Sequence, residues 1–457
     1  MRIFLLSLLF LAFSLPSFAF AEKILDVQTV KSASGIEAWL VEDKAVPVIS
    51  ISFSFEGGLA FDPEDKPGVG RLVSILLDEG AGDMDSQAFQ ASLANNAIHM
   101  GFTAGRDAFY GQIKTLKDKK DVAFKLLHMA LTQARFDADA IERMKNANVS
   151  QIKDDMGDPS WLVARTFNGM VFEGHYYARP GFGDLESMDT ITRKDLQEFA
   201  KTQFARNVLK VAIAGDISKE EAQKALDDIF GSLPEKTEFP DESQEAQPKY
   251  AGKTILLPLD TPQTYIAAGA QGVKRADPAW FPAVIMNYIL GGGGFDSRLM
   301  TEIREKRGLT YGVYSTLNSM KYAGVIQANL SASNEKAAEA LSLLKKEWAA
   351  MAANGPTPEE LQDAKSYLTG SVLLDLTSTN DISDMLNGMQ RDGLGPNYIN
   401  ELNDALNAVT IGDVKKTAAK ILKADDLAVI LVGKPKNINA DIMLDHPPGM
   451  RMPASAQ

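Results

Sequence analysis

A glycine-rich stretch with a cation and a phenol downstream carries the densest potential chemistry in this sequence; its glycines are Gly291, Gly292, Gly293 and Gly294. Glycine lets a backbone adopt positive φ and approach another chain closely. We expect a helix to follow and to end at Gly308, which places Arg304 in its last turn. A strand is expected from Tyr311 to Leu317. The guanidinium and the phenol can therefore converge from a helix end and a strand start.

Other interpretations of this stretch stay open at this point. A loop, a helix cap and an ordinary cation favoured by the helix dipole would use the same residues. Phosphate binding is disfavoured, because no Lys-Ser/Thr pair follows the glycines and the sequence holds no Walker pattern. A self-sufficient hydrolase with an unrelated site is also disfavoured, because the sequence lacks a Gly-x-Ser-x-Gly elbow.

Metal-binding and thiol chemistry find few candidate residues. The chain has no cysteine, which excludes disulfides, thiolate zinc sites and a cysteine nucleophile. Histidine occurs only at His99, His128, His175 and His446, without the spacing that metal ligands need. A metal site built within this chain is therefore short of ligands.

The N-terminus has the pattern of an export signal. Met1-Arg2 precedes an apolar run from Ile3 to Leu15, and Ala19-Phe20-Ala21 has the small-x-small pattern of a cleavage site. We expect residues 1–21 to be a signal peptide, with a periplasmic location and no membrane insertion after its removal; a retained anchor is the alternative. The net charge of −13 argues against a nucleic-acid partner.

Several features occur twice along the chain at nearly the same offset, which indicates an internal duplication. The half-buried strand predicted at Val48–Phe55 has a counterpart at Thr264–Gly272, and an Asp-Pro pair follows each. Thr192 and Thr410 are each expected to cap a helix that leads into an apolar strand. We therefore predict two homologous halves.

The predicted organisation is α+β, with two duplicated domains in a clam-like arrangement. Each domain is expected to pair a mixed, mainly antiparallel β-sheet with α-helices. The N-terminal domain spans residues 22–233 and the C-terminal domain spans residues 251–457. Residues 234–250 are acidic and contain proline, as an exposed linker should. Helical spacing of apolar residues predicts helices at Phe136–Asp155 and Thr357–Leu374.

With these features in view, the sequence resembles the pitrilysin / mitochondrial processing peptidase family of zinc metallopeptidases over almost the whole mature chain. The resemblance implies two duplicated α+β halves around an enclosed chamber. It also implies that Arg304 and Tyr311 form the family's Arg/Tyr pair, which binds peptide backbone and stabilises the oxyanion opposite the metal. The glycines 291–294 would belong to the same substrate-binding region.

The metal motif of that family is absent here. The family carries His-x-x-Glu-His with a distal Glu about 76 residues further on. The flanking glycines set a register that places Arg71, Ser74 and Ile75 at the three motif positions and Gln151 at the distal one. Arg71 would repel a zinc ion and Ile75 offers no lone pair, so we expect no metal in this chain.

The resemblance therefore implies a non-catalytic subunit of a heterodimeric zinc metalloendopeptidase, not expected to be active alone. A catalytic partner of the same family would bring the zinc, and this chain would contribute Arg304 and Tyr311 toward a peptide substrate. The alternative is a catalytically inactive peptide-binding or assembly protein of the same fold.

Overall fold

The computed structural model of this chain describes residues 23–238 and 245–450. The predicted signal peptide, residues 1–21, lies outside the described residues, and so do residues 239–244 of the predicted linker. In the described part of the chain, no helix combines the length and apolar character needed to cross a membrane.

The first sheet has six strands in the order β1-β2-β8-β3-β7-β6. Strands β2 and β8 run parallel, and the other neighbours are antiparallel. The sheet is therefore mixed and mainly antiparallel, as predicted. Its strands are β1 (Gln28–Lys31), β2 (Glu37–Glu42), β3 (Val48–Glu56), β6 (His99–Ala104), β7 (Ala108–Leu116) and β8 (Leu209–Gly215).

The second sheet repeats this plan with the order β11-β12-β10-β13-β9-β14. Five strands correspond one to one with those of the first sheet, including a parallel pair, β9 with β13, at the same place. Only the outermost strand differs, because β14 runs parallel to β9 while β1 runs antiparallel to β2. The strands are β9 (Thr254–Pro258), β10 (Gln263–Gln271), β11 (Val313–Ser319), β12 (Gly324–Ser333), β13 (Ala428–Gly433) and β14 (Ile442–Met443).

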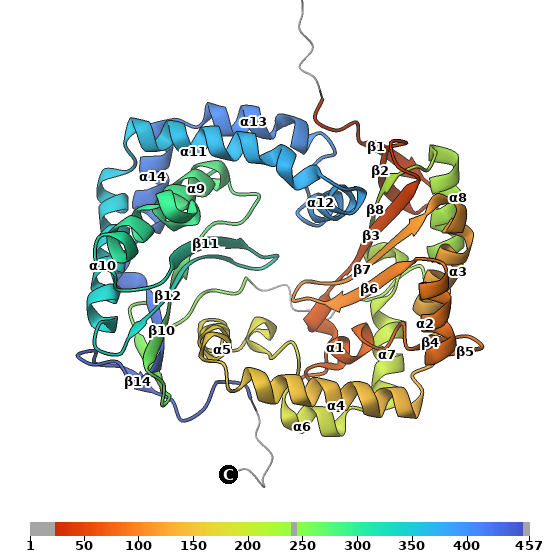
Figure 1. The fold of residues 1–457 in the computed structure, drawn as a ribbon, viewed down its shortest axis with the longest axis horizontal. Coiled ribbons are helices and arrows are strands. Elements are labelled where there is room, and N and C mark those ends of the chain that lie inside the picture. The colour runs from red at the N-terminus through yellow and green to blue at the C-terminus, as the bar shows by residue number, and fades with distance from the viewer. Residues whose placement is uncertain (1–22, 239–244, 451–457) are drawn as a thin grey trace, which may run out of the picture.

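Helices cover the outer faces of both sheets. The two sheets stand on opposite sides of the molecule, with α3 and α8 outside the first and α10 and α14 outside the second (Figure 1). The α-helices are α1 (Val69–Ser74), α2 (Ser86–Asn95), α3 (Lys120–Thr132), α4 (Ala138–Asp155), α5 (Pro159–Val171), α6 (Leu185–Thr190), α7 (Arg193–Gln203), α8 (Lys219–Phe230), α9 (Trp280–Asn287), α10 (Ala337–Asn354), α11 (Pro358–Ser371), α12 (Thr379–Arg391), α13 (Tyr398–Ala408) and α14 (Ile411–Ile421).

Each half lends one helix to the sheet of the other half. Helix α12 packs on β3 and β8 of the first sheet, and helix α5 packs on β10 and β13 of the second (Figure 1). On α5, Phe167 is buried among second-sheet residues that include Ile430 and Val432. On α12, Leu386 is buried beside Trp39 of β2. This exchange joins the two halves through apolar cores, in addition to the linker.

The exchange changes one prediction. Strand β3 was expected to be half-buried, with its small polar residues facing solvent, but both of its faces are buried. The serine face lies under α12, where the hydroxyls of Ser50 and Thr379 are 2.8 Å apart and those of Ser52 and Ser383 are 2.7 Å apart. Small hydroxyl side chains suit a strand that must accept a helix closely, and Ser50 and Ser52 pair their buried hydroxyls, whereas the buried Ser54 hydroxyl has no hydrogen-bond partner among the described residues.

The local helix signals agree with the structure more closely. Thr192 caps α7 in a reciprocal capping box with Asp195, and Thr410 caps α14 in the same way with Asp413. The predicted helix at Phe136–Asp155 begins two residues later, at Ala138. The duplication was inferred from these matching helix starts. In each half the capped helix precedes an apolar strand, β8 in the first half and β13 in the second.

Candidate functional site

Arg304 lies in a short π-helix, η7 (Met300–Glu305), that ends as the sequence predicts. Gly308 has φ of +59° and its N–H donates to the Arg304 carbonyl at 2.9 Å. The guanidinium carbon of Arg304 lies 4.6 Å from the ring centroid of Phe295. In the described part of the chain, no hydrogen bond or ion pair engages the Arg304 side chain.

Tyr311 lies before the strand that it was predicted to begin. Strand β11 starts at Val313, because Thr310 forms a local turn in which its hydroxyl donates to the Gly312 carbonyl at 2.8 Å and accepts from the Gly312 N–H at 3.1 Å. The Tyr311 side chain is 85% exposed. Among the described residues, no hydrogen bond joins it to Arg304, which is half-buried. The two side chains come from adjoining segments and act as separate groups.

The glycine stretch is required by the chain's own packing. A Cβ at Gly291 would lie 2.7 Å from the backbone nitrogen of Ser315 on β11, and one at Gly293 would lie 2.9 Å from the Tyr288 carbonyl. Gly292 is equally close to Asn287, the last residue of α9. Gly294 has φ of +63° and open space around it, so its backbone conformation is what favours glycine there.

Arg298 is a residue of this region that sequence reasoning missed. Its Nε and Nη2 donate to the two carboxylate oxygens of Glu360 at 2.7 and 2.6 Å, and Nη2 also donates to the Gly355 carbonyl at 3.0 Å. This bidentate pair ties the segment before η7 to the start of α11. The hydrogen bond to Glu360 raises the pKa of Arg298.

The helix at the expected metal position, α1, is held by a buried carboxyl group. The Asp62 side chain accepts from the N–H groups of Gly68 and Gly70, both at 2.7 Å. Gly68 has φ of +95° at the N-cap, which turns the chain into the helix. Burial raises the pKa of Asp62 to about 7.

The side chains at the metal-motif positions do not fit a zinc ion. Arg71 stacks its guanidinium carbon 4.8 Å from the Phe182 ring centroid, and its Nε donates to Asn148 Oδ1 at 3.4 Å. Burial lowers the pKa of Arg71. The Ser74 hydroxyl is committed to the Arg71 carbonyl at 2.7 Å, and Ile75 packs against the first core. A cation and its amide and aromatic partners therefore fill the space beside α1.

Gln151, at the expected distal ligand position, points away from this cluster. It is exposed on α4, and its Nε2 donates to Asp155 Oδ1 at 2.7 Å. The residue of α4 that meets Arg71 is Asn148, which is buried. Across residues 23–238 and 245–450, no set of three or more His, Asp or Glu side chains is arranged to hold a metal ion.

The histidines are dispersed. His128 Nδ1 lies 3.0 Å from the Ile229 carbonyl, and His99 lies at the start of the edge strand β6. His175 packs against both Tyr176 and Tyr177, with its ring centroid 4.4 Å from each of theirs. None of the four belongs to a group of three or more His, Asp or Glu side chains that could hold a metal ion within the described residues.

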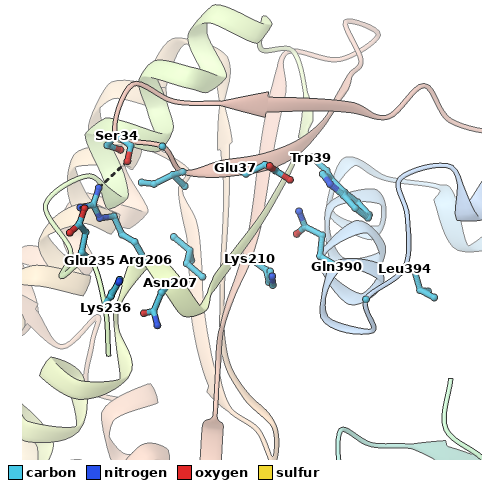
Figure 2. A pocket seen from close by; sticks show the side chains of 14 residues that line it. Ser34, Glu37, Trp39, Arg206, Asn207, Lys210, Glu235, Lys236, Gln390 and Leu394 are labelled. Atoms are coloured by element: carbon cyan, nitrogen blue, oxygen red, sulfur yellow. Dashed lines mark hydrogen bonds and ion pairs between the residues drawn. The ribbon is translucent and has the colours of Figure 1, made fainter. Parts of the chain in front are cut away.

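A cavity of about 750 Å³ lies apart from all of these residues, at the C-terminal end of α12. Its walls include Trp39 and Lys210 from the first sheet, Gln390 from α12 and Arg206 from the turn before β8 (Figure 2). Arg206 is already engaged, because it donates to the Ser34 carbonyl at 3.1 Å and lies 3.6 Å from Glu235. None of the residues predicted for the site lines this cavity.

Comparison with known proteins gives one consistent family. Residues 190–368 match the family described as "Peptidase M16 inactive domain". A solved structure of the peptidase M16 inactive domain from Pseudomonas fluorescens is 30% identical, with a TM-score of 0.84, over 90% of this chain and 99% of that one. The non-peptidase homolog YmxG of Helicobacter pylori is 26% identical over 86% of this chain and 91% of its own length. The mitochondrial-processing peptidase subunit beta of Lentinula edodes is 22% identical over 83% of this chain and 84% of its own.

Proposed function

Because this chain belongs to the peptidase M16 family as an inactive member, we propose that it is the substrate-binding subunit of a heterodimeric zinc metalloendopeptidase. Membership confirms the resemblance first inferred from the Arg304 and Tyr311 pair after the glycine-rich stretch. The partner in our proposal is a catalytic chain of the same family that carries its own zinc. The substrate is a peptide or an unfolded protein segment.

One observation carries the proposal: Tyr311 is exposed and the half-buried Arg304 has no anionic partner among the described residues, while the metal position is filled by Arg71 and its partners. A chain selected only for assembly has no need of a guanidinium that lacks an anionic partner, or of a phenol that is almost wholly in solvent. Both groups are free to bind something outside this chain, whereas the residues around α1 are bound to one another.

The chemistry of the two side chains suits a peptide in which charge develops on a carbonyl oxygen. The planar guanidinium of Arg304 offers a fixed set of N–H donors for carbonyl oxygens. The Tyr311 hydroxyl can donate to an oxygen whose charge grows during the reaction, and such a contact lowers the barrier more than it strengthens ground-state binding. The partner chain supplies the metal and the base; this chain binds and orients the peptide.

We also propose a periplasmic location, on the basis of the signal-peptide pattern in residues 1–21. The partner should then be another exported chain of this family, because the two must meet in the same compartment. A cleavable substrate there would be an exported peptide or an unfolded exported segment.

The test is co-production with a zinc-bearing relative encoded in the same genome. We expect peptide cleavage to require both chains and to fall at least about tenfold when Tyr311 is changed to Phe, since losing one donor to a developing oxyanion costs that much or more. Tyr314→Phe is the matched control, because Tyr314 is also exposed and lies three residues further on. Full activity of the partner alone would refute the proposal.

The same experiment separates the alternative, an inactive peptide-binding or assembly protein. In that case Arg304→Ala would weaken retention of peptide by this chain, and cleavage by the partner would not change. The Helicobacter pylori relative, described as a non-peptidase homolog, is the observation that keeps this second function in view.

A further inference from the structure

Arg304 has no acidic partner among the described residues, although its helix also carries acidic side chains. Glu302 lies two residues before it but is fully engaged elsewhere: its Oε1 accepts from Lys306 Nζ at 2.5 Å and its Oε2 accepts from Arg307 Nη1 at 2.7 Å. These hydrogen bonds, with Lys306 first, hold the pKa of Glu302 below its ordinary value. Two of the three cations near the end of η7 thus pair with one carboxylate, and Arg304 is the one without an acidic partner among the described residues.

The group that does meet Arg304 is an aromatic face. The guanidinium carbon lies 4.6 Å from the Phe295 centroid, within the range of a cation–π contact. Phe295 is 61% exposed, so this contact lies at the surface of the molecule. A carboxylate in its place would occupy two N–H donors of Arg304, whereas a ring face leaves the donors in the guanidinium plane unoccupied.

The turn that presents Phe295 is fixed on both sides. Gly294 supplies the positive φ that starts η6 (Gly294–Asp296). The buried Ser297 closes the turn, because its hydroxyl and its N–H both donate to the Gly294 carbonyl, at 2.8 and 3.2 Å. The backbone of this turn is therefore fixed by its own hydrogen bonds, and it holds the Phe295 ring directly beside η7.

We propose that Phe295 is a positioning residue for Arg304: it holds the guanidinium in place through its ring face and keeps the N–H donors available for the peptide. Its effect on cleavage rests on the proposed function, but the contact itself does not. Phe295 directly follows the four glycines, so this stretch of the chain has a role in addition to the packing of the glycines themselves.

A double-mutant cycle in the co-produced complex tests this inference. Phe295→Leu should lower kcat/KM about three- to tenfold, the size expected of a cation–π contact at a partly exposed site, and Phe295→Tyr should restore it. In the Arg304→Ala background, Phe295→Leu should change kcat/KM by less than about twofold, because a residue that acts through another has no separate effect. Equal losses in both backgrounds, or no loss in either, would overturn the inference.

The first half of the chain provides a matched control. The Arg71 guanidinium carbon lies at a similar distance, 4.8 Å, from the Phe182 ring centroid, beside the helix that carries the degenerate metal motif. Phe182→Leu removes the same kind of contact from a region that is not expected to touch substrate, so kcat/KM should stay within about twofold of the wild type. A loss as large as that of Phe295→Leu would mean that the cleavage assay reports general stability.

A measurement on the single chain keeps this inference separate from the proposed function. If the wild-type complex cleaves no peptide, the proposed function fails, and NMR of the arginine-labelled chain decides the contact alone. The Arg304 side-chain signal, assigned by its loss in Arg304→Lys, should show an upfield ring-current shift that disappears in Phe295→Leu. An identical Arg304 signal in wild type and Phe295→Leu would overturn the positioning role.

Discussion

The exchanged helix α5 makes a sharp prediction at Gly269, a residue of β10 on the face that α5 covers. A Cβ added there would lie 2.5 Å from Cζ and 2.9 Å from Cε2 of Phe167, and 3.3 Å from the Ile326 carbonyl oxygen. Phe167 is 2% exposed, so its ring is enclosed by other residues. Gly269→Ala must therefore push α5 away from the second sheet or distort the strand.

The cost can be estimated from this geometry. Overpacking a buried site by one methyl group typically costs about 1–3 kcal/mol, and we expect that loss in the free energy of unfolding. Phe167→Leu removes the two colliding ring atoms but leaves a cavity, which costs about 1–3 kcal/mol by itself. The double variant should lose at least about 1 kcal/mol less than the sum of the single losses, because the two residues share one contact.

The assay is urea unfolding followed by tryptophan fluorescence, with Trp161 on α5 as a local probe. Gly370→Ala is the control, because Gly370 lies within α11 and a Cβ there meets nothing within 4 Å. This change should be neutral or should stabilise the chain by up to about 1 kcal/mol. A Gly269→Ala midpoint equal to that of the wild type, or additive losses in the double variant, would show that α5 does not pack on the second sheet in this way.

Three further changes test other contacts. Asp62→Asn should flatten the pH dependence of the free energy of unfolding. Because the pKa of Asp62 is raised to about 7, the folded wild type holds this proton more tightly than the unfolded chain. The stabilisation from this proton is therefore full below pH 4 and is lost as the pH rises toward 7 and above, which thermal unfolding at several pH values will show. Arg298→Met should lower the free energy of unfolding by about 1–3 kcal/mol in urea titrations by leaving Glu360 unpaired; an unchanged midpoint would contradict the bidentate pair. Ser52→Cys with Ser383→Cys should form a disulfide in a chain without other cysteines and stabilise it by about 2–4 kcal/mol when oxidised, and failure to cross-link would contradict the packing of α12 on β3.

Local patterns predicted the parts of the fold that are decided locally. The caps at Thr192 and Thr410 depend on side chains three residues away, so they are visible in the sequence. The serine row of β3 was misinterpreted for the opposite reason. Its alternation is the same whether Ser50 and Ser52 face water or a helix from more than three hundred residues away, and only the tertiary structure decides between the two.

The candidate site was located from two sources. Arg304, Tyr311 and the glycines were singled out by their spacing, whereas their roles and the loss of the metal motif came from the resemblance to the family, and the roles stay predictions. The contact between Arg304 and Phe295 was missed, although an apolar ring directly after four glycines was a usable signal. The distal position was harder to place, because counting residues leads to Gln151, whereas the helical period turns Asn148 and Ile152 inward.

The exchange of α5 and α12 between the two halves has a consequence for the evolutionary origin of such a chain. A half-length ancestor with this topology would have left one face of its sheet bare, and two copies would have satisfied each other by swapping one helix apiece. Joining those copies end to end preserves every contact and removes the concentration dependence of the pair.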